Sequence, residues 1–359
     1  MISPFGGKSL SLELLDWYHQ QNYEFPWRKT RDPYSIWISE VMLQQTRVST
    51  VLPYYKRWLF SLPDISSVAN NNIDNILKLW EGLGYYNRAR NFYLACKIIK
   101  EKYRGEIPAD SSEFSKLPGV GPYICAAVMS IAYNMPLPAI DGNAIRVVSR
   151  LNSINIPYPK SKKEIHALLS GLIDPIKPGC FNQAVMDLGR EICTSRGPAC
   201  SVCPICKHCS AHVNNDVYKY PLRIKNTPRP HYHIAVAIIW NNKRILISKR
   251  KSAGLLGGLW EFPGGKIKPR ESGPDCVIRR ARETLNVLVA PGDCIKQIKH
   301  SYSHFTITLD AYRCVLVGGQ PRALSYDDFR WVYPYEMQQF AFHRSNHKLF
   351  DKIEGAVSI

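Results

Sequence analysis

The spacing of apolar residues changes once along the chain, near residue 213. Before that point apolar residues recur every three or four positions, which places them on one face of a helix. Examples are Leu12, Leu15, Tyr18 and His19 near the start and Phe181, Val185 and Leu188 near the end of this part. No alternation with a period of two is long enough there to build a sheet. The pattern predicts an all-α domain over residues 1–212.

After residue 213 the pattern is that of an α+β domain. Residues 213–230 are polar and carry three prolines, which favours an extended linker. His231–Trp240 and Arg244–Ser248 are typical of two strands joined by a turn at Asn241-Asn242. Further strand-like runs are 304–312 and 313–317, and one helix is predicted at 275–285. We therefore expect an α+β domain over residues 231–359.

The net charge of the chain indicates the kind of molecule that it binds. The formal net charge is +18 at pH 7, and both parts contribute to it. Residues 1–212 carry 24 Lys and Arg against 17 Asp and Glu, and residues 213–359 carry 23 against 12. Such an excess favours binding to a polyanion such as nucleic acid, although a merely soluble basic protein would share it.

The N-terminal residues and the hydropathy of the chain indicate the compartment in which the protein is found. The N-terminal residues lack the apolar stretch of a signal peptide, and no segment approaches the length needed to span a membrane. We therefore expect an intracellular protein, cytoplasmic or associated with a bacterial-type nucleoid. In that compartment the 11 cysteines are expected to be thiols or metal ligands rather than disulfides.

Five of these cysteines lie within a short segment. Cys193, Cys200, Cys203 and Cys209 are separated by six, two and five residues, and Cys206 lies between the last two. Thiolates this close predict one loop that a metal holds together. Zinc and a [4Fe-4S] cluster both take four cysteines, so spacing alone leaves open both the metal and the place of Cys206 among the ligands.

Two carboxylates and a glycine turn carry the other candidate chemistry. The turn Leu117–Gly121 joins two helical stretches, and its glycines would leave backbone N–H groups free to bind a phosphate, or simply connect the helices. Asp141 precedes a helical stretch and would either cap it or face a bound ligand. Glu40 lies in the apolar run Ile36–Leu43, where burial would raise its pKa and suit it to donate a proton. The alternative is a solvated Glu on the surface of a helix, which the apolar flanks disfavour.

These motifs, in this order, closely resemble the MutY-type adenine DNA glycosylases of the helix-hairpin-helix superfamily. The resemblance spans essentially the whole first domain. It rests on Pro26-Trp27-Arg28, Ser39-Glu40-Val41-Met42-Leu43-Gln44-Gln45-Thr46, Gly82-Leu83-Gly84-Tyr85-Tyr86, Leu117 to Tyr123, Asp141-Gly142-Asn143, Phe181-Asn182-Gln183 and the cysteine loop.

The resemblance implies catalytic roles. Glu40 would protonate the adenine and then help to activate water, while Asp141 would stabilise the oxocarbenium-like sugar and Asn143 would orient the acids. Tyr123 occupies the position at which endonuclease III-type lyases have a lysine that attacks the sugar. Because tyrosine cannot form a Schiff base, we expect a monofunctional glycosylase, with nearby Lys116 as the one route to residual lyase activity.

The resemblance also implies ligands and DNA contacts. It assigns Cys193, Cys200, Cys203 and Cys209 to a [4Fe-4S] cluster and leaves Cys206 outside it. Gln45 and Tyr85 would enter the base stack when adenine is flipped out of the duplex. The predicted DNA-binding residues are Trp27, Arg28, Gln45, Thr46, Leu83, Gly84, Tyr85, Gly119, Gly121 and Gln183.

The second domain resembles a Nudix domain over residues 261–287. Gly265, Glu271, Arg279 and Glu283 fit that pattern, but Arg280 and Thr284 stand at positions where acidic residues are expected. A magnesium site is therefore unfavourable, and we expect a recognition domain rather than a hydrolase. Tyr302, Ser303 and His304 match the family's loop for recognising 8-oxoguanine, with tyrosine in place of phenylalanine.

We therefore expect hydrolysis of adenine from mispairs with 8-oxoguanine or guanine in double-stranded DNA, by a monomer. Three alternatives remain. An endonuclease III-like lyase is opposed by Tyr123, and a nucleotide pyrophosphohydrolase is opposed by the incomplete glutamate set. A non-catalytic DNA-binding or redox-sensing protein would use the cluster alone.

Overall fold

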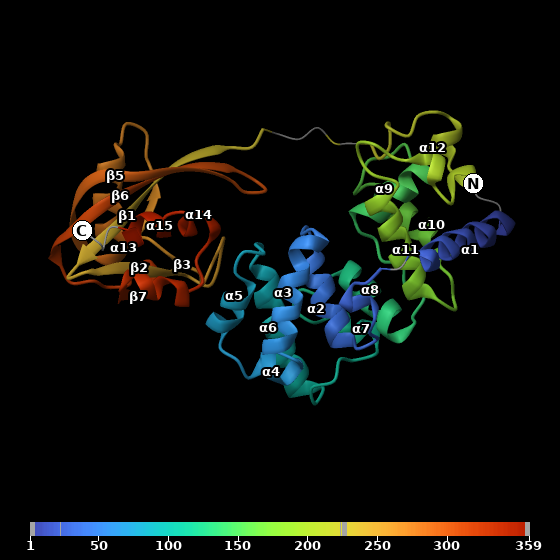
Figure 1. The fold of residues 1–359 in the computed structure, drawn as a ribbon, viewed down its shortest axis with the longest axis horizontal. Coiled ribbons are helices and arrows are strands. Elements are labelled where there is room, and N and C mark those ends of the chain that lie inside the picture. Colours follow the sequence, from blue (N-terminus) through green and yellow to red (C-terminus); the bar gives the residue numbers. More distant parts are fainter. Residues whose placement is uncertain (1–3, 22, 223, 225–227, 356–359) are drawn as a thin grey trace. The chain divides into compact units, whose positions relative to one another are not determined.

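The computed structural model describes residues 4–21, 23–222, 224 and 228–355. Contacts divide the chain into two compact units, residues 1–70 with 91–226 and residues 71–90 with 227–359. The first unit contains helices and the second is built on a sheet (Figure 1). The predicted domain boundaries at 212 and 231 stay a prediction, and residues 223 and 225–227 of the predicted linker lie outside the described residues.

The first unit is helical, as predicted. Its elements are α1 (Pro4–Gln20), η1 (Pro26–Arg28), α2 (Pro33–Leu43), α3 (Val48–Ser61), α4 (Ile65–Ala69), most of α6 (Asn87–Lys102), α7 (Ser111–Ser115), α8 (Pro122–Tyr133), α9 (Gly142–Leu151), α10 (Lys162–Leu172), α11 (Pro178–Glu191), η2 (Cys200–Val202), η3 (Cys206–His208) and α12 (Ser210–Val213). Among the described residues, none of the helices combines the length and apolar character that crossing a membrane requires.

Helix α1 forms where the spacing predicts it, but its buried face is different. Leu10, Leu14 and Leu15 are buried against α9, α10 and α11, whereas Leu12 is 58% exposed. Four leucines within six residues allow more than one apolar stripe, and packing against the neighbouring helices selects one of them.

Helix α2 is buried on all sides. Tyr34 and every residue from Ile36 to Met42 are buried, including Glu40. Around this helix lies a cluster of aromatic rings, in which the Trp37 ring centroid is 4.4 Å from that of Phe92 and 5.2 Å from that of Phe114. A helix that is apolar all round belongs in a core, and this one carries a carboxyl group into that core.

Helix α11 packs very closely against α8. A Cβ atom placed on Gly179 would lie 2.7 Å from the Cα of Ile131 and 2.7 Å from the carbonyl oxygen of Ser130. Farther along α11, the buried side chain of Asn182 donates to the Ser130 hydroxyl at 2.9 Å and to the Leu137 carbonyl at 2.8 Å. Its oxygen accepts from the Ala139 N–H at 3.0 Å, so one residue fixes the segment that leads to Asp141.

The second unit contains α5 (Ile73–Trp80) and a mixed sheet of seven strands. The strands are β1 (His231–Asn241), β2 (Arg244–Arg250), β3 (Trp260–Glu261), β4 (Gly264–Lys266), β5 (Val287–Ser301), β6 (Thr306–Gly319) and β7 (Tyr326–Val332). Their order is β3-β2-β1-β6-β5, with β4 paired to β1 and β7 paired to β2. β1 and β6 run parallel, whereas β1 and β2 form an antiparallel hairpin.

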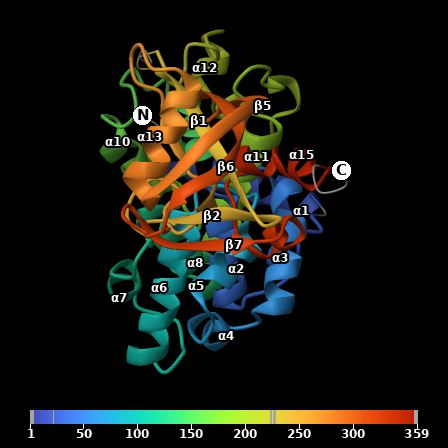
Figure 2. The same cartoon turned by 90° about the vertical axis from the view of Figure 1, so that its left-hand side faces the viewer.

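Both faces of this sheet are covered. Ala235, Ala237 and Ile239 of β1 pack with α13 (Gly273–Leu285), and Val236 and Ile238 lie in the opposite core. This follows from the period of two in a strand, which sends successive side chains to opposite faces. Helix α13 crosses one face in Figure 2, and η4 (Pro334–Gln339), α14 (Arg344–His347) and α15 (Phe350–Glu354) complete the unit.

The strand predictions were partly correct. The hairpin of β1 and β2 is confirmed, although its turn residues with positive φ are Asn242 and Lys243 rather than Asn241 and Asn242. The predicted helix at 275–285 is confirmed as part of α13. The runs 304–312 and 313–317 are strand, as predicted, but they form one continuous strand, β6, rather than two. Strands β3, β4, β5 and β7 were not predicted.

We predict that Gly179→Ala destabilises the first unit, because a Cβ there meets backbone that cannot move aside cheaply. The expected loss is about 1–3 kcal/mol of unfolding free energy, measured by urea unfolding followed through helical circular dichroism.

Gly171→Ala is the matched control. Gly171 lies in α10 and a Cβ placed on it meets nothing within 4 Å. Its replacement should leave stability unchanged or raise it by up to ~1 kcal/mol, because alanine favours a helix. Equal effects of the two substitutions would contradict the packing argument.

Candidate active site

The candidate acid Glu40 is buried and hydrogen-bonded. Its side chain projects from α2, is 6% exposed, and accepts a hydrogen bond of 2.5 Å from the hydroxyl of Tyr123. Burial raises the pKa of Glu40, and the Tyr123 hydrogen bond and the charge of Arg28 oppose this shift. Burial also raises the pKa of Tyr123 well above its usual value, so the phenol remains the donor. This pair can hold a proton on a carboxyl group in a dry environment.

Asp141 lies at the start of α9 and is its N-cap. One carboxylate oxygen accepts from the Ala144 N–H at 2.7 Å, and the other accepts from the Asn143 side chain at 2.9 Å. The interpretation of Asp141 as a helix cap is therefore correct. Burial raises the pKa of Asp141, whereas these hydrogen bonds lower it. Its charge also raises the pKa of Glu40.

Asn143 is held in turn by Arg146, which the sequence analysis did not identify. The Arg146 guanidinium donates to the Asn143 side-chain oxygen at 2.8 Å and to the Gly189 and Cys193 carbonyls at 2.5 and 2.7 Å. The amide of Asn143 is thereby oriented with its NH₂ group toward Asp141. Arg146 stands one helical turn after Asn143, which is the only sequence signal for this contact.

A third carboxylate of the site, the buried Asp187 of α11, was also missed. It forms ion pairs with Arg28 at 3.0 Å and with Arg190 at 3.1 Å. Arg28 also donates to the Tyr18 hydroxyl, which in turn donates to Gln183. The charges of Arg28 and Asp187 act on the pKa of Glu40 in opposite directions. A single Asp within a helix carries no local sequence signal for this role.

The predicted phosphate-binding turn has the expected shape. Gly119 has a positive φ of 78°, and a Cβ on it would lie 2.7 Å from the Cβ of Asn91. Gly121 is the N-cap of the 12-residue helix α8 and has open space where a side chain would project. No side chain at Gly121 therefore covers the start of α8, where a phosphate is predicted to bind.

The other predicted DNA contacts fall into two groups. Gln45 and Tyr85 are exposed and have positive φ values of 56° and 48°, a backbone conformation that costs energy in residues other than glycine. Gly84 also has a positive φ of 72°, and Thr46 is half-buried. The buried ones are Trp27, Leu83 and Gln183, and the Arg28 side chain is 12% exposed. All remain predictions as DNA contacts.

The five cysteines of the loop after α11 line one small cavity. Cys193, Cys200, Cys203, Cys206 and Cys209 share it with the buried Arg150, whose guanidinium donates to the Cys193 sulfur at 3.3 Å. Burial raises the pKa of Cys203 to about 12. In the described part of the chain, no three His, Cys, Asp or Glu side chains are arranged to hold a metal ion. The donor set and the buried cation nevertheless suit a thiolate-bound, negatively charged centre.

The predicted 8-oxoguanine loop lies between β5 and β6 of the second unit. Ser303 and His304 are exposed, and Tyr302 is half-buried with its hydroxyl 3.2 Å from that of Ser345. The hydroxyls of Ser303 and Tyr85, which belong to the same unit, form a hydrogen bond. Two residues predicted from separate motifs are thus brought together.

The glutamates of the Nudix-like segment are paired with arginines. Arg279 contacts Glu271 at 2.5 Å and Glu283 at 3.0 Å, and Arg280 contacts Glu283 at 3.2 Å. The Arg279 hydrogen bond helps to lower the pKa of Glu271 to about 2. These ion pairs occupy the carboxylates that a divalent cation would need.

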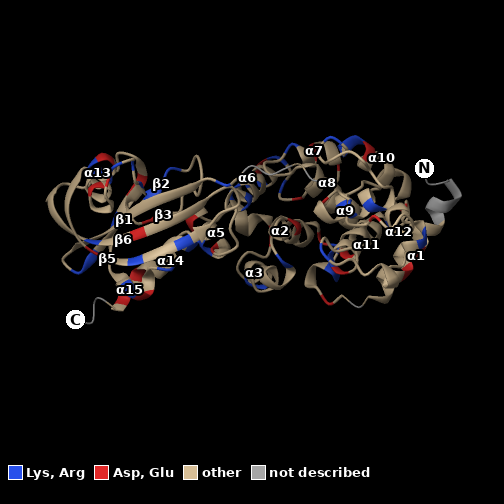
Figure 3. Ribbon diagram, turned by 90° about the horizontal axis from the view of Figure 1, so that it is seen from above, with Lys and Arg blue, Asp and Glu red and all other residues tan. Residues whose placement is uncertain are grey.

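Lys and Arg residues are distributed over both units, with Asp and Glu between them (Figure 3).

Comparisons with known proteins match both parts of the chain. Residues 38–175 match the HhH-GPD superfamily base excision DNA repair proteins, and residues 235–352 match the NUDIX domain. The adenine DNA glycosylase of Rattus norvegicus is 30% identical, with 94% of this chain and 76% of the rat protein covered. That of Buchnera aphidicola (subspecies Acyrthosiphon pisum) is 35% identical over 83% of this chain and 84% of its own.

Solved structures show the same helical fold. A thermostable thymine-DNA glycosylase has a TM-score of 0.54 and 30% identity, covering 57% of this chain and 96% of its own. Endonuclease III in a trapped DNA complex has a TM-score of 0.52 at 24% identity, covering 60% of this chain and 99% of its own. The predicted fold class is confirmed, and the chain belongs to the adenine DNA glycosylases, enzymes of base excision repair that act on N-glycosyl bonds.

Proposed function

We propose that this glycosylase removes adenine paired with 8-oxoguanine or guanine in duplex DNA and leaves an abasic site. The observation that carries the proposal is the buried Glu40 with its hydrogen bond from Tyr123. A proton held at this carboxyl group makes adenine a better leaving group once it is transferred to the ring. We expect a monomer that acts on the DNA of the cytoplasm or nucleoid.

Glu40 acts first as a general acid and then, as a carboxylate, as a base toward water. Its raised pKa favours the protonated form that the first step needs. Loss of adenine develops positive charge on the sugar, and Asp141 stabilises that charge. Asn143 and Arg146 hold the Asp141 carboxylate in place through their hydrogen bonds.

Strand cleavage does not accompany base removal. Tyr123 has no amine and its hydroxyl is engaged with Glu40. Lys116 is exposed and forms an ion pair of 2.5 Å with Glu113, so its amine is protonated and a poor nucleophile. The chemistry therefore ends at hydrolysis.

Access to the glycosidic bond requires the adenine to leave the duplex. Gln45 and Tyr85 are exposed on strained backbone, which suits residues that enter the base stack. The start of α8, with Gly119 and Gly121, binds a phosphate of the DNA strand that carries the adenine. Binding at Trp27, Arg28, Thr46, Leu83, Gly84 and Gln183 would accompany this motion.

The second unit inspects the base opposite adenine. The hydroxyl of Ser303 and the imidazole of His304 are exposed and can hydrogen-bond the carbonyl and N–H that distinguish 8-oxoguanine from guanine. Tyr302 is anchored near Ser345 and holds this loop in place.

Cys193, Cys200, Cys203 and Cys209 would hold a [4Fe-4S] cluster. Such a cluster cross-links the loop after α11 and supplies structural support rather than a catalytic group. The buried Arg150 offsets its negative charge and also binds the carbonyl of Thr194, so the same residue ties the loop to α9.

We predict that the purified chain releases adenine from duplexes with adenine opposite 8-oxoguanine or guanine, and that Glu40→Gln lowers the single-turnover rate by at least ~10³-fold. Glutamine keeps the shape of the side chain but has no proton to transfer. Alkaline cleavage of the abasic sites, followed by denaturing gel electrophoresis, measures adenine release by the unmodified chain and by Glu40→Gln. Absence of release from the 8-oxoguanine duplex would sink the proposal.

The same assay tests recognition of the opposite base. Ser303→Ala should weaken the preference for 8-oxoguanine over guanine by roughly tenfold, as expected for one lost hydrogen bond, and leave release from the guanine mispair unchanged. Ser301→Ala, two residues earlier on the exposed end of β5, is the control and should retain the preference.

The pH dependence should change in Tyr123→Phe. Glu40 must be protonated to act as an acid, so the rate falls as pH rises through its pKa. The Tyr123 hydrogen bond stabilises the carboxylate and lowers this pKa. Its removal should move the falling limb of the single-turnover pH profile to higher pH. Tyr103→Phe, which removes a hydrogen bond to Glu113, should leave the limb in place.

For the cysteine loop, we predict that Cys203→Ser loses bound iron and that Cys206→Ser retains it. The chain purified without oxygen is measured by iron and sulfide content and by visible absorption. Zinc without iron in the unmodified chain would contradict the cluster, and loss of iron in Cys206→Ser would replace the assigned ligand set.

A further inference from the structure

Cys206 is the cysteine of the loop after α11 to which the proposed cluster gives no role. It lines the same small cavity as Cys193, Cys200, Cys203 and Cys209, and it is half-buried as they are. A cysteine kept for packing alone is usually a small apolar residue inside a core. Five thiols therefore line a site for which four are sufficient.

The backbone around Cys206 repeats the turn that begins at Cys200. In η2 the Cys203 N–H donates to the Cys200 carbonyl at 3.2 Å, and in η3 the Cys209 N–H donates to the Cys206 carbonyl at 3.0 Å. Both turns end in extended backbone, with φ and ψ of −77° and 123° at Cys203 and of −89° and 104° at Cys209. The loop thus contains two successive Cys-x-x-Cys turns, and this is the spacing with which two thiolates of one turn bind the same metal.

The two turns follow each other without a break. The Cys206 N–H donates to the Cys203 carbonyl at 3.2 Å, and Cys200, Cys203 and Cys206 stand at equal intervals along the chain. Bacterial ferredoxins bind Fe–S clusters through a run with the same Cys-x-x-Cys-x-x-Cys spacing. Cys206 therefore stands at a spacing that suits a third ligand of the cluster.

Cys206 is placed to substitute for Cys209 rather than for Cys193. It begins η3, and Cys209 directly follows the end of η3. Residues one turn apart on such a helix lie on the same side of it. Cys193 instead follows α11, where its N–H donates to the Leu188 carbonyl at 2.7 Å and its sulfur accepts from Arg150 at 3.3 Å. A shift by one turn of η3 would therefore exchange Cys209 for Cys206 and keep Cys193.

We propose that Cys206 is a reserve ligand, which binds the [4Fe-4S] cluster when Cys209 is lost. The inference rests on the cluster proposed above. The iron–sulfur bond of Cys209 breaks, the Cys206 sulfur binds the same iron, and the proton of the Cys206 thiol passes to Cys209 or to water. No electron is transferred, and the negative charge beside Arg150 is unchanged. Oxidation of Cys209, which removes it as a ligand, would then leave the cluster in place.

The test is the iron and sulfide content of alanine variants of the full chain, purified without oxygen. Alanine is used because, unlike serine, it offers iron no ligand atom. Cys209→Ala and Cys206→Ala should each keep most of the iron and of the visible absorption of the unmodified chain. The iron content of the double variant should fall by roughly tenfold or more, because too few thiolates remain to complete a ligand set.

Cys294 supplies the matched control. It is exposed and lies on β5 of the second unit. The double variant Cys209→Ala with Cys294→Ala removes as many thiols as the first double variant but leaves Cys206, so it should keep its iron. Cys193→Ala should lose its iron, because Cys206 replaces Cys209 and not Cys193.

Alkylation of the iron-loaded protein identifies the ligand directly. In the unmodified chain Cys206 is a free thiol and should react with iodoacetamide, as the exposed Cys294 does. In Cys209→Ala the Cys206 thiol should be protected, because its sulfur is bound to iron, whereas Cys294 should still react. Mass spectrometry of the digested protein measures the alkylated fraction of each cysteine.

Loss of iron in a Cys209→Ala variant that keeps its helical circular dichroism would overturn the reserve role, and so would alkylation of Cys206 in that variant when it is loaded with iron. Cys209→Ser, which preserves the size of the side chain, takes its place if Cys209→Ala does not fold. In both of these outcomes the unmodified chain still contains iron and the cluster itself stands. Absence of iron from the unmodified chain would overturn the cluster and the reserve ligand together.

Discussion

Burial of the Glu40 carboxyl group is the constraint on which the helical unit depends. A carboxyl group among apolar side chains must either stay protonated or be compensated by nearby donors and cations. Tyr123 supplies a donor, and Arg28 supplies a cation whose own charge is balanced by Asp187. Asp141 adds a second negative charge that disfavours ionisation of Glu40. Burial and Asp141 thus favour the protonated form of Glu40, whereas the Tyr123 donor and the Arg28 cation favour its carboxylate. A residue proposed to act as both acid and base needs both forms.

Helix α11 fixes the positions of the residues around Glu40 and Asp141. Its Asn182 clamps the segment before Asp141, its Asp187 pairs with Arg28, and its Gly189 brings it against α9. A Cβ on Gly189 would lie 2.6 Å from that of Asn143, so a larger residue would displace the side chain that orients Asp141. The helix also leads directly into the cysteine loop. A centre bound there would therefore stabilise the far end of the same element that positions the carboxylates.

The sequence was sufficient where a motif is local. The helical spacing of apolar residues predicted the helical fold. The order of the glycine turn, the two acids and the cysteines carried the resemblance to the family, and the hairpin of β1 and β2 followed from a short turn between apolar runs. It was insufficient where the structure depends on distant partners. Asp187 acts through Arg28 of η1, and the Arg146 guanidinium reaches beyond its own helix to the carbonyls of Gly189 and Cys193. Strand β5 was missed because register shifts around Pro291 and Cys294 interrupt its alternation. Trp27, Leu83 and Gln183 show that a motif can indicate the region of a site without revealing which of its side chains are buried.

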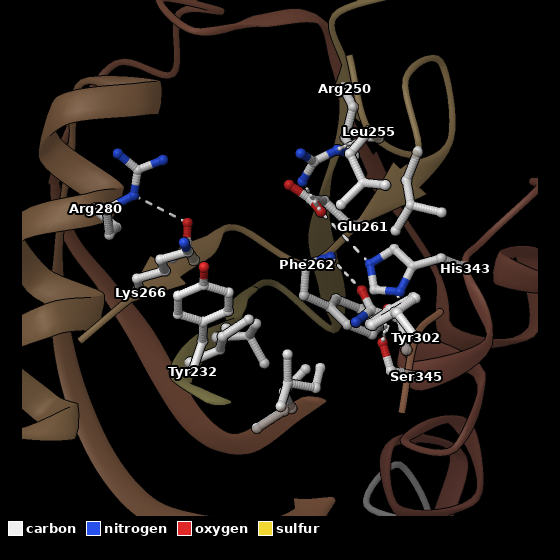
Figure 4. Close-up of a pocket in the computed structure, with 18 of the residues that line it drawn as sticks. Tyr232, Arg250, Leu255, Glu261, Phe262, Lys266, Arg280, Tyr302, His343 and Ser345 are labelled. Carbon is white, nitrogen blue, oxygen red and sulfur yellow. Dashed lines mark hydrogen bonds and ion pairs between the residues drawn. The ribbon is translucent and has the colours of Figure 1, made fainter. Parts of the chain in front are cut away.

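The two faces of the Nudix-like sheet differ in their polar side chains. On the face covered by α13, arginines at 279 and 280 neutralise Glu271 and Glu283, so a cation that would polarise a phosphate has no ligands there. On the opposite face, Tyr232, Ile234 and Val236 line a cavity (Figure 4) that also contains the buried Asn346, whose Nδ2 has no hydrogen-bond partner among the described residues. An unpaired amide donor in a core reduces stability, and a surface substitution cannot satisfy it. Loss of free carboxylates for a cation, with retention of the fold, is expected of a Nudix-like domain that does not hydrolyse a diphosphate.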